Sequence, residues 1–337
     1  MRYLLLFMVP VFWLGSIAEA QSDADSWAIR GQQAYQAQNY QQAAVAWRQA
    51  AESGAVGAQF NLGLLYQLGR GVPQSYSQAV YWWNQAAEQK DAKAQYNLGW
   101  AYENGAGVLQ DIEQAVSFYQ QAANQGLAQA EFKVAQAYEQ GTGAPENKKL
   151  ALKWYLRAAR QGIEAAFVHI AEIYGAQNDR SKAILWYLKA AEAGNVQAQY
   201  QAGNYYTSAP DKDLAKARQW YQKAAEAGNA DAWYQLGLLH GSSQRISDQE
   251  AAYQAYGKAA RLGHPRAQYN LGLLYAHGRG VAADPIKAYM WLRLAFDNAQ
   301  RPLTRMIRKL ANQLNPEERA RTWRQAQLCR SSNYTNC

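Results

Sequence analysis

The sequence is poor in the residues on which many catalytic and metal sites depend. Its 337 residues include four histidines and two cysteines. No histidine has the spacing of a zinc-binding motif, and neither a P-loop nor a nucleophile elbow is present. With eight prolines and a helical pattern throughout, the chain leaves no room for a β-sheet. We therefore expect no enzyme, no bound metal and no cofactor.

Long apolar runs are also missing, except at the start of the chain. Residues 1–20 hold a positive charge at Arg2, an apolar core from Leu4 to Leu14 and the small-x-small sequence Ala18-Glu19-Ala20. This is the pattern of a secretory signal peptide with cleavage before Gln21, and an uncleaved anchor is the alternative. No cysteine follows the apolar core, which argues against a lipoprotein. We expect a periplasmic or secreted protein without a membrane span after cleavage.

The most prominent feature of the sequence is an internal repeat. Residues 55–90 and 91–126 share the pattern A-x-A-Q-[FY]-N-L-G-x-x-Y, then G-x-G-V, then a second apolar pattern that ends in Ala-Ala. The pattern returns every 34 to 36 residues, with one unit of 32. Seven units begin at Ala55, Asp91, Leu127, Ile163, Asn195, Asn229 and His264. A repeat of this length indicates a solenoid.

Each unit contains two helical patterns. In the unit that begins at Ala55, Ala58, Leu62 and Tyr66 recur with helical spacing in the first pattern. The second pattern is a small residue, a ring and a small residue, as in Ala79-x-x-x-Trp83-x-x-Ala86. Helices of about a dozen residues are marginal alone in water. The units must therefore stack on one another to be stable.

Taken together, L-G-x-x-Y, G-x-G-V and A-x-x-x-[WY]-x-x-A-A resemble the Sel1-like repeat family, a subtype of the tetratricopeptide (TPR) superfamily. The resemblance implies an all-α, right-handed α-solenoid of antiparallel helix pairs that acts as a scaffold or adaptor, often in bacterial envelopes. Some cysteine-rich relatives have been linked to penicillin binding or β-lactamase activity. Those relatives carry a disulfide within each repeat, which this chain lacks.

The sequence predicts four segments. Residues 1–20 are the signal peptide, 21–54 a TPR-like N-terminal capping unit, 55–299 the seven repeats and 300–337 a basic C-terminal cap. We expect the first helix pair over residues 27–38 and 41–52. Two further helices are expected over residues 303–314 and from the N-cap Asn315 to about Cys329, because Asn-Pro-Glu-Glu is a strong helix start.

Charge and cysteine are both concentrated at the C-terminal end. The net charge of the chain is +8, and eight Arg and Lys against two Glu give residues 300–337 a charge of 8 − 2 = +6. This end is either a solvated cap or a contact for an acidic protein, lipid or anionic polymer. In an exported protein Cys329 and Cys337 are expected to form a disulfide. Free thiols or an intermolecular bridge are the alternatives.

The G-x-G sequences between paired helices have two interpretations. They could bind phosphate, but no strand precedes them and no lysine follows in the required place. The alternative is a helix C-cap, where glycine adopts the left-handed conformation without strain. We favour the C-cap.

A surface on the first helices is the best candidate for function. The resemblance implies that these helices line the concave face of the solenoid. One helical position is rich in rings, and further positions on the same face add Trp100, Glu103 and Glu139. The rings at that position are Phe60, Tyr96, Phe132, Tyr200, Tyr234 and Tyr269. They form a partner-binding groove, or they pack on their neighbours as core.

Three functions are compatible with this surface. The first is an adaptor for a protein partner, such as an extended peptide in an envelope assembly. The second is a peptidoglycan or polysaccharide binder, suggested by the rings and the basic end. The third, an enzyme, lacks any motif. Nucleic acid is disfavoured because the signal peptide directs the chain out of the cytosol.

Overall fold

The computed structural model describes residues 23–208, 212–243, 245–298, 305–332 and 334. These residues form eighteen α-helices and no strand. The expected all-α solenoid of packed helix pairs is therefore confirmed. The chain divides into two compact halves, Met1–Gln161 and Gly162–Cys337, and each is described by itself.

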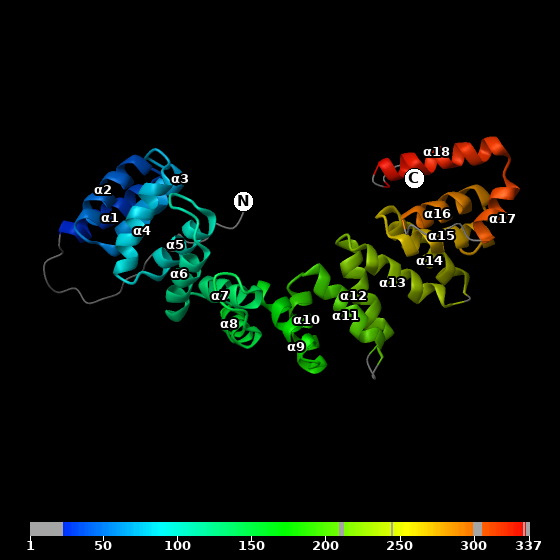
Figure 1. Ribbon diagram of the computed structural model, residues 1–337, viewed down its shortest axis with the longest axis horizontal. Helices are drawn as coiled ribbons and strands as arrows, with labels where there is room; N and C mark the ends of the chain where they lie inside the picture. The colour runs from blue at the N-terminus through cyan, green and yellow to red at the C-terminus, as the bar shows by residue number, and fades with distance from the viewer. Residues whose placement is uncertain (1–22, 209–211, 244, 299–304, 333, 335–337) are drawn as a thin grey trace. The chain divides into compact units, whose positions relative to one another are not determined.

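Helices of the N-terminal half pack in chain order, each on the next (Figure 1). Their bounds are α1 Asp23–Gln36, α2 Tyr40–Glu52, α3 Val56–Leu68, α4 Tyr76–Glu88, α5 Ala92–Asn104, α6 Ile112–Asn124, α7 Ala128–Gln140 and α8 Lys148–Arg160. Odd-numbered helices are the first of each pair, and even-numbered helices are the second.

The C-terminal half continues the alternation and then departs from it. Its paired helices are α9 Ala165–Ala176, α10 Arg180–Glu192, α11 Val196–Ser208, α12 Leu214–Glu226, α13 Ala230–Gly241, α14 Ile246–Arg261, α15 Pro265–His277 and α16 Pro285–Asn298. Helices α17 Arg305–Gln313 and α18 Pro316–Ser331 both pack on α16. Asn315 caps α18 through a capping box with Glu318, as the sequence predicted.

The core of each half is built from aromatic rings of the second helices, which lie on glycines of the first helices. Trp83 on α4 is fully buried, and a Cβ added to Gly63 on α3 would overlap its ring. A Cβ on Gly99 would lie 2.6 Å from the Tyr119 ring. The same contact recurs at Gly31, Gly203 and Gly237. In these five pairs, a glycine of the first helix therefore makes room for a buried ring of the second helix, and in the last pair Gly272 makes room for Leu292 instead.

The two glycines of each G-x-G turn have different tasks. Gly69 is the left-handed C-cap of α3, with φ of 64°, and its N–H donates to the carbonyl of Leu65. The C-cap interpretation is thereby confirmed for the first glycine. Gly71 has φ of 71°, and a Cβ there would overlap the Tyr40 carbonyl at the start of the preceding second helix. The second glycine lets the turn lie against the neighbouring pair.

The exposed end of the first helix pair is polar where internal pairs are apolar. Gly31 and Gly63 are equivalent because each carries the ring of its own second helix. Arg30 and Gln33 therefore correspond to Leu62 and Leu65, which are both fully buried. Arg30 and Gln33 are exposed, which is the composition expected at the end of a stack.

At the other end of the chain, α17 and α18 extend the apolar core of the last repeat. Ile307, Leu310 and Ala326 are buried in the same cluster as Leu292. Cys329 is buried there too, whereas Cys337 lies outside the described residues. The disulfide between them therefore stays a prediction.

Candidate functional site

The predicted ring position is half-buried in most repeats. Tyr96, Phe132, Tyr200 and Tyr234 keep part of their surface in solvent, and Tyr269 is 38% exposed. Phe60 differs, because it is 5% exposed and belongs to the core of the N-terminal half. For Phe60 the core alternative is the correct one, and its side chain offers little surface to a partner.

Each half-buried ring rests on the ring of its own second helix. Tyr96 lies 5.3 Å from Tyr119 between ring centroids, and Tyr200 lies 5.9 Å from Tyr221. Tyr269 lies 6.1 Å from Phe296. Such tilted or edge-on pairs are favourable ring geometries. Within each half, the inner ring therefore supports an outer ring that keeps part of its surface in solvent.

Glu103 belongs to an internal polar cluster around Tyr96. The Tyr119 hydroxyl donates to Glu103 Oε2 at 2.5 Å, and Lys133 Nζ lies 2.9 Å from the same oxygen. Burial, and then the charge of Glu103, raise the pKa values of both Tyr96 and Tyr119. The carboxylate of Glu103 thus joins two repeats, and its side chain is 34% exposed.

Trp100, which also belongs to α5, lies beside a residue that the sequence did not single out. Its ring centroid is 6.0 Å from that of Tyr76, the first residue of α4 and 38% exposed. The two rings form a partly exposed aromatic patch. The periodic pattern on the first helices does not include Tyr76, because Tyr76 belongs to a second helix.

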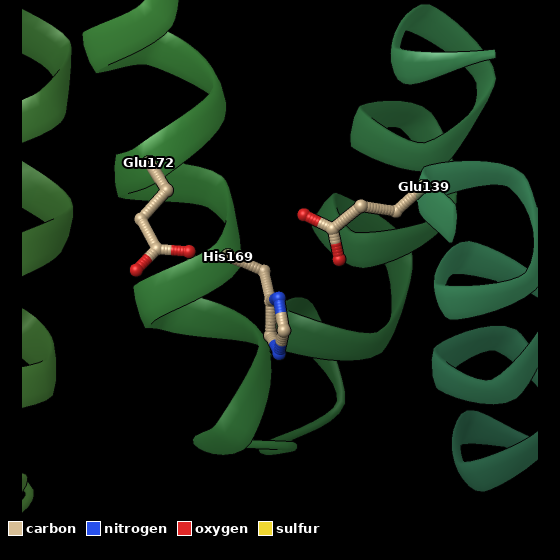
Figure 2. A group of neighbouring side chains, drawn as sticks. All are labelled: Glu139, His169 and Glu172. Atoms are coloured by element: carbon tan, nitrogen blue, oxygen red, sulfur yellow. The ribbon is translucent and has the colours of Figure 1, made fainter. Parts of the chain in front are cut away.

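Glu139 has a tyrosine partner in its own repeat, as Glu103 does. The Tyr155 hydroxyl donates to Glu139 Oε2 at 2.6 Å, and Phe132 lies 5.5 Å from Tyr155. Figure 2 shows Glu139 on α7. It also shows His169 and Glu172, which lie one turn apart on α9. In the C-terminal half, Tyr221 donates instead to Asn204 at 2.7 Å.

Tyr234 contacts two rings, one in its own repeat and one at the start of the next. It lies 6.0 Å from Tyr256 and stacks on His264, with ring centroids 4.5 Å apart and planes 19° apart. Nδ1 of His264 accepts the N–H of Ala267 at 3.0 Å, which caps α15. Nε2 of His264 lies 3.1 Å from Asp231 Oδ1. One face of the Tyr234 ring is therefore covered.

A row of buried polar side chains was missed from the sequence. The glutamine of A-x-A-Q is buried at Gln59, Gln95, Gln199 and Gln268. Gln59 donates to the Ala51 carbonyl at 3.1 Å, and Gln268 donates to the Ala260 carbonyl at 3.2 Å. The glutamine thus donates a hydrogen bond to a backbone carbonyl at the C-terminal end of the preceding second helix. Its presence in four of the seven units was the signal that could have found it.

One repeat replaces this glutamine with an ion pair. Glu131, 1% exposed, lies 2.6 Å from Arg157 Nη2 and accepts from Gln161 Nε2 at 2.8 Å. In the preceding repeat, Gln95 donates to Gln121 at the equivalent positions, at 3.3 Å. The buried polar side chain at this position is paired with a charged partner in one repeat and with a neutral partner in the other. This arrangement is structural, because both partners are used within the chain.

The model for the Sel1 repeat matches more than half of the sequence. It matches residues 56–91, 92–127, 128–163, 172–195, 196–229, 230–264 and 265–299. The chain belongs to the Sel1 repeat family. The predicted number of seven repeats is confirmed, although the fourth match begins at residue 172 rather than 163.

Two solved structures are similar to this Sel1 repeat chain. A Sel1 repeat protein from Oxalobacter formigenes is 35% identical, with a TM-score of 0.57, and the match covers 64% of this chain and 90% of that one. A protective antigen present in uropathogenic Escherichia coli strains, with an SLR fold, is 23% identical. Its TM-score is 0.58, and the match covers 93% of this chain and 84% of that one. No curated protein matches.

Family membership fits a protein-interaction scaffold, since Sel1 repeats suggest protein partners. Among the helices that the structure describes, none is long and apolar enough to cross a bilayer. In the basic C-terminal segment, the arginines Arg321, Arg324 and Arg330 of α18 are exposed.

Proposed function

We propose that this Sel1 repeat protein is an exported scaffold that binds an extended segment of a protein partner in the bacterial envelope. The observation that carries the proposal is the row of Tyr200, Tyr234 and Tyr269. They occupy the same position of α11, α13 and α15, and each is backed by a ring of its own pair. Tyrosines fixed in this way lose little conformational entropy on binding and are common in interfaces.

A polysaccharide is the second candidate, and one contact disfavours it. A sugar ring binds tyrosine by lying flat on an open aromatic face. His264 already covers one face of Tyr234. A peptide can instead use the exposed edges and hydroxyl groups of the row, because a hydroxyl both donates and accepts.

A site-specific photo-crosslinker tests the binding surface. It is placed at Tyr269, 38% exposed on a first helix, or at Leu185, 60% exposed on the second helix α10. We expect one protein partner to be cross-linked in native cells from position 269 and not from position 185. Equal capture from both positions, or capture of cell-wall glycan alone from position 269, would contradict the proposal.

Export is a separate part of the proposal and has its own test. Residues 1–20, which lie outside the described residues, have the signal-peptide pattern. Intact-mass and N-terminal analysis of protein from the periplasmic fraction should give a chain that begins at Gln21. A full-length chain that begins at Met1 and stays in the cytosolic fraction would refute export.

A further inference from the structure

The last two repeats and α18 enclose a cavity of about 310 Å³ in the C-terminal half. Its walls come from α14, α15, α16 and α18. The tyrosine row described above contributes no residue to it. The volume is at the lower end of the range for small-molecule sites and corresponds to about ten water-sized volumes.

A glycine in the wall of this cavity has no role in helix packing. Gly257 lies inside α14, where glycine costs about 1 kcal/mol relative to alanine. A Cβ there would approach only the Arg261 side chain, at 3.6 Å. The equivalent positions after the buried ring are Gln120, Leu156 and Gln222 in other repeats. The glycine therefore widens the cavity rather than seating a ring.

Hydrogen-bond donors outnumber acceptors at one side of the cavity. The hydroxyls of Tyr253 and Tyr275 lie 2.9 Å apart. One proton joins the two oxygens, so the other hydroxyl proton can be donated to a ligand. The Arg261 guanidinium lines the same cavity, and no carboxylate of the described residues lies within 4.0 Å of it.

The one carboxylate in the lining is already neutralised. Asp284 lies 3.4 Å from Lys287 Nζ, and its other oxygen accepts the Lys287 N–H at 2.9 Å. Counting Arg261, Lys287 and Asp284, the lining carries one net positive charge. The lining also has an apolar part, in which Leu271, Met290 and Trp291 are all buried.

We propose that this cavity binds a carboxylate carried on an apolar, arene-sized body. The carboxylate lies against Arg261 and the tyrosine pair, and the apolar body packs on Met290 and Trp291. Charge-assisted hydrogen bonds to a guanidinium are among the strongest in proteins. The ligand is either a small free acid or the carboxyl terminus of a peptide, which share this chemistry.

The full chain with ¹³C-methyl methionine provides a direct readout by NMR, because Met290 lines the cavity and the chain has four methionines. We expect 3-phenylpropanoate to give a saturable shift of the Met290 methyl signal. Its neutral analogue, 3-phenylpropan-1-ol, should bind at least about tenfold more weakly, because it lacks the charge that Arg261 recognises. N-acetyl-Ala-Phe and its amide distinguish the sources: binding of the free peptide indicates a peptide carboxyl terminus, and binding of phenylpropanoate alone indicates a small acid.

Three variants make the test specific. Arg261→Gln should weaken phenylpropanoate binding about tenfold or more, and Gly257→Leu should abolish it by filling the cavity. Lys258→Gln is the matched control, because Lys258 is the next residue of α14 and lies over Trp233, at 4.1 Å, outside the cavity. It should bind as the native chain does. Equal binding of acid and alcohol, unchanged binding in Arg261→Gln, or no saturable shift at millimolar concentration would overturn the proposal.

Discussion

Individual glycines decide how closely the two helices of a repeat approach. Gly57 and Gly63 lie in the same helix α3, yet their surroundings differ. A Cβ on Gly57 would meet nothing within 4 Å, whereas one on Gly63 would overlap the Trp83 ring. Helix propensity favours alanine at both positions, so only packing separates them.

This pair of glycines gives the first prediction. Gly57→Ala should leave the free energy of unfolding unchanged or raise it by about 0.5 kcal/mol, because alanine is the better helix former. Gly63→Ala should lower it by about 1–3 kcal/mol, because the Trp83 ring must move. Urea denaturation of both variants measures the difference. Equal stability of the two variants would show that the ring does not rest on Gly63.

The buried pair of Glu131 and Arg157 gives the second prediction. Arg157→Gln should lower the free energy of unfolding by about 3 kcal/mol, because it leaves a buried carboxylate without its cation. Glu131→Gln should cost less, since Arg157 is 36% exposed and reaches water.

The double variant tests how these two residues are coupled. It recreates the neutral pair of Gln95 and Gln121 and should recover most of the stability lost in Arg157→Gln. A double-mutant cycle from denaturation curves gives the coupling energy. Strictly additive losses would mean that the two side chains do not interact.

At the scale of helices, the N-caps of the first helices are interchangeable in function but differ in chemistry. Asp91 accepts the N–H of Ala94 at 2.7 Å, and Asn229 accepts that of Ala232 at 2.8 Å. His264 performs the same task with Nδ1. Since Nδ1 can accept only when it is unprotonated, α15 has a cap that acid can remove.

The third prediction follows from this cap. Burial lowers the pKa of His264, against the opposing charge of Asp231, and burial also lowers the pKa of His240. The folded state then binds fewer protons than the unfolded chain below the unfolded histidine pKa, about 6.5. The contribution of these histidines to stability is therefore complete above about pH 6.5 and is lost as the pH falls through that value towards the folded pKa.

His264→Asn isolates the contribution of the cap. Asparagine is a good N-cap and does not titrate, and Arg266, Tyr234 and Asp231 around it are unchanged. Denaturation between pH 7.5 and 5 should show a weaker dependence of stability on pH than in the native chain. An identical slope in both proteins would contradict the role of His264.

Much of the helical structure could be predicted from the sequence, and what could not be predicted has physical causes. Periodicity located the helix pairs, and Asn315 with Glu318 identified the last helix start because capping is local. Helical spacing does not reveal the burial of Phe60, because that burial depends on how the next repeat packs. Tyr76 beside Trp100, and Glu103 beside Lys133, also depend on contacts between repeats that helical spacing does not contain.

For the whole molecule, stability should be a sum over neighbouring repeats, since each pair packs mainly on the next. The tyrosine row depends on the same arrangement, because each of its tyrosines stands at the same position of a successive first helix. Removing one complete repeat should therefore preserve the fold. Removing only the second helix of a pair should not preserve the fold, because the first helix then lacks the ring that packs on its glycine.

Two deletions in the N-terminal half make this the fourth prediction. The first removes residues 91–126, which contain α5 and α6, and the second removes residues 109–126, which contain only α6. The second deletion leaves Gly99 without Tyr119.

Thermal unfolding followed by circular dichroism is the most direct test of a stack of interchangeable helix pairs. The 91–126 deletion should keep the native helical signal per residue and unfold cooperatively. The 109–126 deletion should lose signal per residue and cooperativity. Similar behaviour of the two deletions, or unfolding of the chain when one complete repeat is removed, would contradict a stack of interchangeable helix pairs.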